Sequence, residues 1–437
     1  MKSVILKSNS LVGKRNTRTR GRKFVDRWAK VFVLNTLDKL NRGRIVLEDG
    51  ENSIVYGERD ANALTAHIKV LSQDFYVDLI RGGSIGCGES YMWHHWTSND
   101  LVTLVRVIVL NLHILDGVDR GQTWFRRLAT RILHRMNANS PEGSRRNISA
   151  HYDLSNDFFV SFLDPSMMYS SAIFPHEASS LHEASLHKLT HICERLQLSA
   201  KDHLLEIGTG WGSLAIHAAQ NYGCRVTTTT LSQQQFDFAR QRIIEAGLEE
   251  RIELLLRDYR DLEGSYDKLV SIEMIEAVGH EFYANYFEKC ASLLSSEGLM
   301  LIQAITISDQ RYDQAKNSVD FIQRYIFPGG CLPSNQVIAK HVAQDTDMQI
   351  IGLEDITRDY ARTIAHWRER FLAQTQDYLA QGFSGDFIRM WDYYLAYCQG
   401  GFMERVIHTS QFLIAKPLFR DTPRIVSSAS RAGESCA

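Results

Sequence analysis

The stretch Leu204-Leu205-Glu206-Ile207-Gly208-Thr209-Gly210-Trp211-Gly212 decides the fold. It begins as an apolar strand and ends in three glycines at alternate positions, and helical spacing continues from there to residue 222. Glycine has no Cβ, so such a turn lets the backbone approach a ligand at the carboxyl end of a buried strand. The helix that follows presents free backbone N–H groups at the same place. The stretch therefore predicts a ligand site on a strand–turn–helix unit.

The class of ligand stays open at this point, because a glycine-rich turn fits dinucleotides, phosphates or the amino-acid end of S-adenosylmethionine. The spacing G-x-G-x-G differs from the G-x-G-x-x-G of nicotinamide binders. Glu206 is placed to hold a ligand amine, and Gly208, Gly210 and Gly212 are the candidate cradle. Threonines at 227–230 stand where an acid for a ribose is expected. A tight turn without a ligand is the alternative.

Strands and helices alternate around this turn, which is typical of a parallel sheet with helices on both faces. We expect strands at 203–207, 224–230, 251–256, 268–272 and 299–307, and helices at 211–222, 233–246 and 279–294. The pattern predicts an α/β domain of the Rossmann type over 147–420.

The chain before that domain has a different pattern. Short strands and helices predict a small α+β domain over 31–136, with strands at 43–48, 53–56 and 66–70 and helices at 101–115 and 123–136. We interpret the glycines of 82–88 as a tight loop. A segment of turn formers and charges at 137–146 predicts a linker. The tail at 421–437 is rich in Ser, Ala and Arg and is expected to be disordered.

The composition narrows the class of protein. The 437 residues are 44% hydrophobic and 23% charged, which is ordinary for a packed chain. No run reaches the roughly 18 apolar residues of a membrane-spanning helix, and none near the start is long enough for a secretory signal. The seven cysteines form no C-x-x-C pair, so neither a zinc knuckle nor a disulfide framework is expected. These features predict a cytoplasmic protein.

Charge is concentrated in the basic segment 1–30, which holds ten basic side chains and one acid although the net charge of the chain is −2. Such a segment suits anionic lipid headgroups, and a solvated tail is the alternative. Interleaved aromatic residues and a recognition motif for nucleic acid are missing, so we expect no nucleic-acid partner. We also expect no metal site. Glu183, His187 and His191 recur at helical spacing, but a solvated face is favoured because no fourth ligand accompanies them.

Four further segments occur in a fixed order. They are Ser149-Ala150-His151-Tyr152-Asp153-Leu154-Ser155-Asn156-Asp157-Phe158-Phe159, Met168-Tyr169-Ser170-Ser171-Ala172, Glu273-Met274-Ile275-Glu276-Ala277-Val278-Gly279-His280 and Phe327-Pro328-Gly329-Gly330-Cys331-Leu332-Pro333-Ser334. This set resembles the cyclopropane-fatty-acyl-phospholipid synthases and the mycolic acid cyclopropane synthases over about 147–416. Gly86-Cys87-Gly88-Glu89-Ser90-Tyr91 also resembles the lipid-binding domain of longer members. The resemblance implies a methyltransferase domain with a helical lid.

The resemblance implies S-adenosylmethionine as the methyl donor. The segment Thr230-Leu231-Ser232-Gln233-Gln234-Gln235 matches the family's T-L-S-x-x-Q, which offers hydroxyl and amide groups to the ribose. The implied donor site comprises Tyr169, Ser170, Gly208, Gly210, Thr230, Leu231, Gln235, Asp258 and Tyr259.

The implied reaction is methylene transfer to the cis double bond of an unsaturated phospholipid acyl chain, through a carbocation that closes to a cyclopropane ring. A bound bicarbonate is the implied base. Its implied holders are Glu276, Tyr360, the backbone at Ile305 and the backbone at Ser171, with Tyr152 close by. Many bacterial members have His where this chain has Gln303, which we interpret as a variant anion ligand.

Three alternatives remain at this point. A fatty-acyl C-methyltransferase would make a methyl or methylene branch if the cation lost a different proton. A small-amine N-methyltransferase shares some motifs but does not account for the lipid-like N-terminal domain. A non-catalytic protein that binds lipid or S-adenosylmethionine is the third. In the synthase interpretation the partner is a membrane phospholipid, the protein is peripheral at the inner face of the membrane, and a homodimer is compatible with the sequence.

Overall fold

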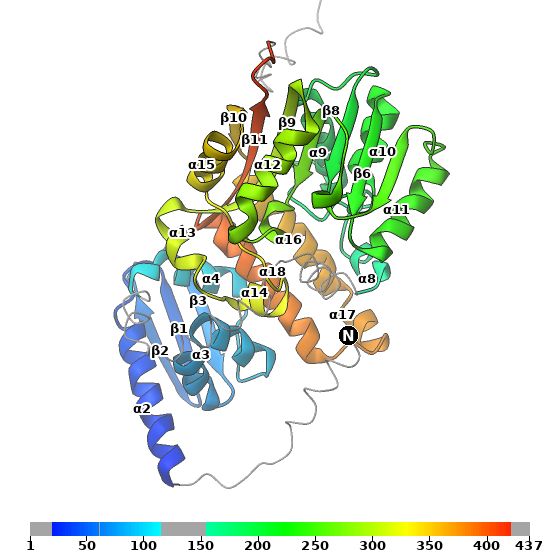
Figure 1. Ribbon diagram of the computed structural model, residues 1–437. Coiled ribbons are helices and arrows are strands. Elements are labelled where there is room, and N and C mark those ends of the chain that lie inside the picture. Colours follow the sequence, from blue (N-terminus) through cyan, green and yellow to red (C-terminus); the bar gives the residue numbers. More distant parts are fainter. Residues whose placement is uncertain (1–19, 61, 115–153, 421–437) are drawn as a thin grey trace, which may run out of the picture.

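The computed structural model describes residues 20–60, 62–114 and 154–420. Two sheets, one of seven strands and one of four, are joined by long helices (Figure 1). Several expected features lie outside the described residues. They are the first part of the basic segment, the helix at 123–136, the linker at 137–146, Tyr152 and the tail at 421–437.

The seven-stranded sheet has the order β10-β11-β9-β8-β5-β6-β7. Its strands are β5 (His203–Ile207), β6 (Arg225–Thr230), β7 (Ile252–Leu256), β8 (Tyr266–Ile272), β9 (Leu294–Ile307), β10 (Gln349–Asp355) and β11 (Ile407–Ala415). Strands β5 to β9 pair in parallel, and β11 runs antiparallel to both its neighbours. This confirms the expected parallel sheet. Strand order reverses beside β5, and ligands bind at such a switch point.

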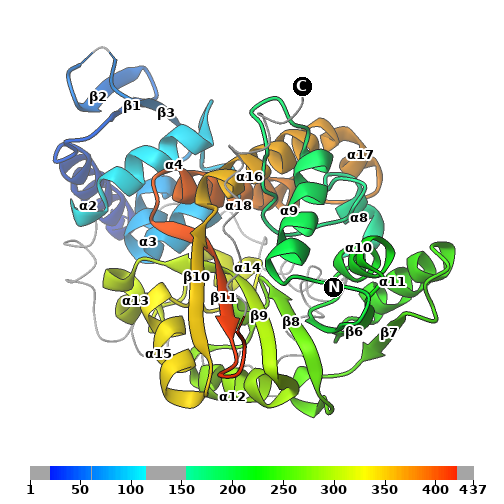
Figure 2. The same cartoon turned by 90° about the horizontal axis from the view of Figure 1, so that it is seen from above.

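Helices cover both faces of this sheet (Figure 2). On one face lie α9 (Leu181–Arg195), α10 (Ser213–Tyr222) and α11 (Gln233–Glu245), and on the other lie α12 (Tyr283–Leu293) and α15 (Asn335–Asp345). Adjacent residues of β5 point to opposite faces, as a pleated strand requires. Leu204 therefore joins the core with α10, and Leu205 joins the core with α12.

The smaller sheet confirms the expected mixture of strands and helices before residue 115. Its order is β2-β1-β3-β4, formed by β1 (Arg44–Asp49), β2 (Asn52–Gly57), β3 (Thr65–Val70) and β4 (Trp96–Thr97). The helices that accompany it are α2 (Arg20–Leu37), α3 (Asp74–Met92) and α4 (Leu101–Leu110).

The expected tight loop at 82–88 is reduced to a break at one residue, because the remaining glycines lie in the helical segments of α3. Gly83 has a non-helical backbone, with φ 55° and ψ −130°, and α3 bends there. The glycines serve close packing instead. A Cβ on Gly86 would lie 2.1 Å from the carbonyl oxygen of Asp78, and a Cβ on Gly88 would lie 2.3 Å from the ring of Phe321.

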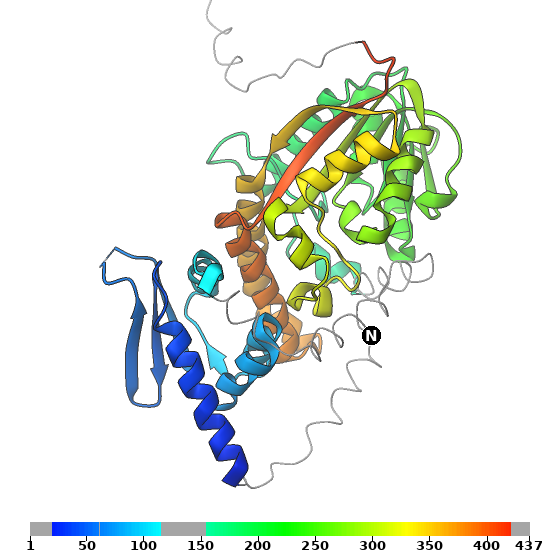
Figure 3. The same cartoon turned by 60° about the vertical axis from the view of Figure 1, so that its left-hand side comes forward.

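Two long helices, α16 (Thr357–Ala373) and α18 (Gly385–Met403), lie between the two sheets (Figures 1 and 3). The hydroxyl of Tyr91 donates to Asp392 at 2.8 Å, and Arg389 donates to the carbonyl of Tyr91. Arg106 pairs with Glu404 at 2.6 Å. The small sheet, α16 and α18 therefore share one continuous hydrophobic core.

Short elements complete the described structure. They are α8 (Asn156–Val160), η2 (Tyr259–Asp261), η3 (Ile275–Ala277), η4 (His280–Phe282), α13 (Asp309–Ala315), α14 (Phe321–Tyr325) and α17 (Thr375–Ala380). Among the helices of the described part, none combines the length and the apolar character that crossing a bilayer requires.

Candidate active site

The glycine turn follows β5 and has the backbone that the sequence predicts. Gly208, Gly210 and Gly212 have φ values of 105°, 54° and 88°, a region that side chains with a Cβ rarely adopt. Helix α10 starts directly after them. The side chain of Met274, which follows β8, lies beside Gly208. The turn therefore faces the end of β8.

The next parallel strand brings the predicted ribose-binding group to the same edge. Thr230 ends β6, and its hydroxyl donates to the amide oxygen of Gln235 at 2.9 Å. Ser232 caps α11 by accepting from the backbone of Gln235. Leu231 is half-buried between them. The hydroxyl and amide groups are thus held by one another at the carboxyl end of the sheet.

The Asp258-Tyr259 segment follows β7 at that edge. The Asp258 carboxylate accepts from the guanidinium of Arg260 at 2.6 and 2.8 Å, and the Tyr259 ring packs edge-on against Tyr286. These contacts hold the segment beside the neighbouring strand ends.

Two buried ionisable groups, Glu206 on β5 and Lys188 on α9, have shifted pKa values. The Glu206 carboxylate accepts from the hydroxyl of Thr228 at 2.6 Å, and burial raises its pKa to about 8. Lys188, on α9, donates to the hydroxyl of Ser170 at 2.7 Å, and burial lowers the pKa of its ammonium to about 8. Tyr169, next to Ser170, lies within hydrogen-bond reach of the Tyr394 hydroxyl at 3.1 Å.

The centre of the site is the carboxylate of Glu273, the residue that follows β8. It accepts three hydrogen bonds, from the backbone N–H of Ser171 at 2.9 Å, the amide of Gln303 at 2.8 Å and the hydroxyl of Tyr360 at 2.7 Å. Its φ is 49°, an uncommon value for a residue with a side chain. The carboxylate is fully buried, and burial raises its pKa. The three hydrogen-bond donors act in the opposite direction and lower it.

A second carboxylate, Glu276, lies one turn further along. One of its oxygens accepts from the backbone N–H of Ile305, and the other has no hydrogen-bond partner among the described residues. Burial, together with the charge of Glu273, raises the pKa of Glu276 to about 8. Two buried carboxyls this close cannot both ionise readily, so the pair shares a proton.

The structure brings together five of the six predicted catalytic residues, namely Ser171, Gln303, Ile305, Tyr360 and Glu276. The sixth, Tyr152, is outside the described residues. Sequence reasoning missed Glu273. An available signal was the run Glu273-Met274-Ile275-Glu276, which places two acids three residues apart directly after a buried strand.

An aromatic cluster adjoins Glu273 through Tyr360, whose hydroxyl donates to this carboxylate. Tyr169 packs against Trp367 at 5.2 Å and against Phe327 at 6.4 Å between ring centroids. Tyr360 stacks on Phe402 at 4.4 Å. A site that excludes water and presents aromatic faces and a carboxylate is suited to a developing positive charge.

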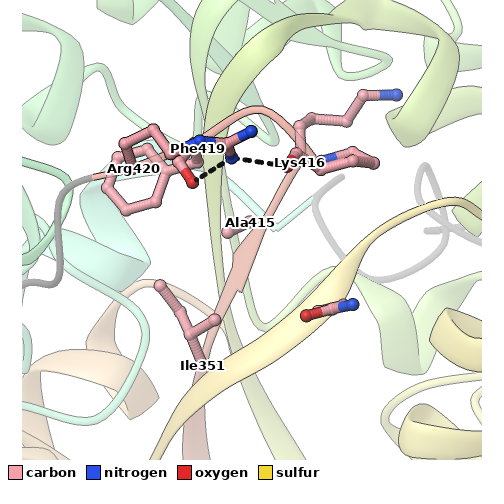
Figure 4. A pocket seen from close by; sticks show the side chains of 7 residues that line it. Ile351, Ala415, Lys416, Phe419 and Arg420 are labelled. Atoms are coloured by element: carbon pink, nitrogen blue, oxygen red, sulfur yellow. Dashed lines mark hydrogen bonds between the residues drawn. The ribbon is translucent and has the colours of Figure 1, made fainter.

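Two other features do not belong to this site. A surface pocket lies at the opposite edge of the sheet, where Ala415 pairs with Leu299 at the amino end of the parallel part of β9 (Figure 4). In the part of the chain that the structure describes, no three His, Cys, Asp or Glu side chains gather as a metal site requires. Glu183 instead caps α9, and His191 pairs with Glu354 at 2.8 Å.

The mycolic acid cyclopropane synthetase family matches residues 139–412. This chain belongs to that family. Tuberculostearic acid methyltransferase UfaA1 of Mycobacterium tuberculosis is 40% identical over 344 residues, which are 77% of this chain and 80% of that protein. Cyclopropane-fatty-acyl-phospholipid synthase of Escherichia coli strain K12 is 36% identical, over 80% of this chain and 88% of that enzyme.

A solved structure of the same family agrees with the fold. Mycolic acid cyclopropane synthase CmaA1, complexed with SAH and CTAB, superposes with a TM-score of 0.58 at 29% identity, covering 62% of this chain and 98% of that one. Family membership makes the chain an S-adenosylmethionine-dependent methyltransferase of fatty acids or lipids. S-adenosylmethionine is among the ligands that a glycine turn of this kind fits.

Proposed function

We propose that this protein is a cyclopropane-fatty-acyl-phospholipid synthase, which transfers a methylene from S-adenosylmethionine to the cis double bond of a phospholipid acyl chain. The observation that carries the proposal is the buried carboxylate pair, Glu273 and Glu276, placed beside the glycine turn and enclosed by aromatic rings. A small-amine methyltransferase needs no such provision for a carbocation.

The chemistry follows from the weak nucleophilicity of an isolated alkene. The alkene carbon attacks the sulfonium methyl, a C–C bond forms, the S–CH₃ bond breaks and S-adenosylhomocysteine leaves. This step requires the two reactants to be held in line at close distance. The resulting cation is stabilised by aromatic faces and carboxylate charge. Loss of a proton from the added methyl lets the C–H electron pair close the ring.

The donor site is proposed from the family resemblance and the observed geometry together. The glycines take the amino-acid end of the donor, and Thr230 with Gln235 takes the ribose. Tyr169 and Ser170 directly precede Ser171, whose backbone N–H donates to Glu273, so we assign them to the region of the sulfonium. Asp258 and Tyr259 close the edge of the adenosine site.

The bicarbonate that the resemblance implies has no free ligand set in this arrangement. The N–H of Ser171, the amide of Gln303 and the hydroxyl of Tyr360 all donate to Glu273, and the N–H of Ile305 donates to Glu276. No step of the proposed mechanism is therefore assigned to bicarbonate.

We also propose that the protein acts at the inner membrane surface, from the cytoplasm, through α2. Trp28 and Phe32 stack at 5.7 Å on an exposed face of this helix, with Val25 and Val31 beside them. The side chain of Arg27 is exposed next to this face. In Figures 1 and 3, α2 lies at the outer side of the molecule, away from the large sheet. Apolar and basic side chains together fit an anionic lipid surface. A homodimer stays a prediction.

The similarity to UfaA1 favours a second candidate, a fatty-acyl C-methyltransferase that forms a methyl or methylene branch. Both reactions share the methyl transfer and the cation. They differ in which proton the cation then loses, and therefore in whether the released C–H electron pair closes a ring. The aromatic enclosure and the carboxylates are compatible with either product.

The test is to express the chain in a bacterial host that lacks its own synthase and to analyse phospholipid fatty acids by gas chromatography–mass spectrometry and NMR. We expect a mass gain of one methylene together with upfield cyclopropane protons. The same mass gain with vinyl or methyl-branch signals would support the branching enzyme instead. Unchanged fatty acids in a host with abundant unsaturated lipid would contradict both.

A further inference from the structure

We propose that Glu273 is the base that removes the proton from the added methyl group, and that its carboxylate occupies the place of a bound bicarbonate. This inference rests on the proposed function, because it assigns a step within that reaction. It concerns a residue of the chain itself and predicts that the enzyme works without an added anion.

The first support is the set of donors. The backbone N–H of Ser171 and the amide of Gln303 donate to one oxygen of Glu273, and the hydroxyl of Tyr360 donates to the other. Three donors from three separate elements converge on this one carboxylate. An anion of the size of bicarbonate would need the same donors, so the two cannot be bound in that way together.

The orientation of Gln303 is itself held in place. Its amide oxygen accepts from the amide of Gln411 on β11 at 2.9 Å, and the oxygen of Gln411 accepts from Arg195 at 3.3 Å. The NH₂ group of Gln303 is thereby turned toward Glu273. A chain of donors starting at a guanidinium thus ends on the carboxylate and favours its ionised form.

The second support is position. The backbone N–H of Glu273 donates to the carbonyl of Gln303 at 2.7 Å, and the next residue, Met274, lies beside Gly208. Glu273 therefore stands between the end of β9 and the turn that takes the methyl donor. The left-handed backbone at Glu273 is strained for a residue with a Cβ, and such conformations cluster at functional sites.

The division of the shared proton supports the same role. Glu276 accepts one backbone hydrogen bond and has an oxygen without a partner among the described residues, whereas Glu273 has three donors. The buried ammonium of Lys188 also favours a negative Glu273. The proton of the pair therefore resides on Glu276, and Glu273 remains the acceptor.

The step balances without a further reactant. The carboxylate of Glu273 takes H⁺ from the methyl group of the cation, the C–H electron pair forms the third bond of the ring, and the product is neutral. Glu273 is left as a carboxylic acid. It returns its proton to water after the lipid leaves.

The test uses purified full-length protein, native and as Glu273→Gln, Glu273→Ala and Glu297→Gln. Glu297→Gln is the matched control, because Glu297 is an exposed carboxylate near the start of β9. Assays contain vesicles of unsaturated phospholipid and S-adenosylmethionine in buffer freed of carbon dioxide, with and without added bicarbonate. S-adenosylhomocysteine and modified lipid are measured. Binding of ¹³C-bicarbonate is followed separately by NMR without the methyl donor.

We expect native protein and Glu297→Gln to be equally active with and without bicarbonate and to bind no ¹³C-bicarbonate at the site. Glu273→Gln should lose about 10²–10⁴-fold of its rate, the usual contribution of a general base, with no recovery on adding bicarbonate. Glu273→Ala leaves three donors facing a space, so it should bind ¹³C-bicarbonate and regain activity with it.

Saturable ¹³C-bicarbonate binding by the native protein, or a native rate that depends on bicarbonate, would overturn the proposal. So would a folded Glu273→Gln with native activity. Failure of the proposed function is a distinct result, because the native protein would then release no S-adenosylhomocysteine from any unsaturated vesicle. Even if the protein proved inactive, the ¹³C-bicarbonate measurement would show whether bicarbonate or Glu273 occupies the site, because it needs no turnover.

Discussion

At the scale of single residues, Glu276 makes a testable link between pH and stability. Its pKa is raised from 4.5 to about 8, so the folded protein keeps a proton that the unfolded chain releases. Native stability should therefore fall as pH rises from about 4.5 to about 8, by up to about 1.4 kcal/mol per pH unit. Glu276→Gln cannot ionise, so its melting temperature should exceed the native value increasingly from pH 5 to pH 8. It should bind S-adenosylhomocysteine normally. Calorimetry at several pH values checks this, with Glu297→Gln as control. Parallel melting curves for native protein and variant would contradict the raised pKa.

At the scale of elements, the contact between α3 and α18 depends on a glycine. A Cβ on Gly88 would lie 2.3 Å from the ring of Phe321 and 2.9 Å from that of Tyr393. Both rings are buried, so Gly88→Ala should destabilise the protein by about 1–3 kcal/mol through overpacking. Gly82→Ala is the matched control on the same helix, because its Cβ would meet nothing within 4 Å. Urea unfolding measures both. Equal stability of the two variants would show that the rings can move aside.

At the scale of the whole molecule, the exposed face of α2 should control access to the lipid. Trp28→Glu places a charge where we propose that the helix enters the headgroup region, so binding to anionic vesicles should fall at least tenfold. Activity on vesicles should fall with it. Ile244→Glu is the control, because Ile244 is a similarly exposed apolar residue on α11. Co-sedimentation with vesicles measures binding, and far-ultraviolet circular dichroism checks folding. Unchanged vesicle binding by Trp28→Glu would remove α2 from the membrane contact.

Local patterns in the sequence were sufficient to predict most strands of the large sheet. Strands β5 to β9 follow from apolar or β-branched runs, because a parallel strand buried on both faces tolerates little else. The glycine turn follows from the absence of Cβ atoms. The predicted residues at 171, 276, 303, 305 and 360 came from the family resemblance, and the structure gathers them at one edge of the sheet.

By itself, then, the sequence determined the strand–turn–helix unit, the parallel sheet and the family, since each depends on residues close together in the chain or on an ordered set of motifs. Tertiary structure alone decided two other matters. Position 88 requires glycine because Phe321, more than 230 positions away, packs where a Cβ would stand. Glu273 became the centre of the site because donors from residues 171, 303 and 360 meet on it. Such contacts join residues that are far apart in the sequence, so a local sequence pattern does not predict them.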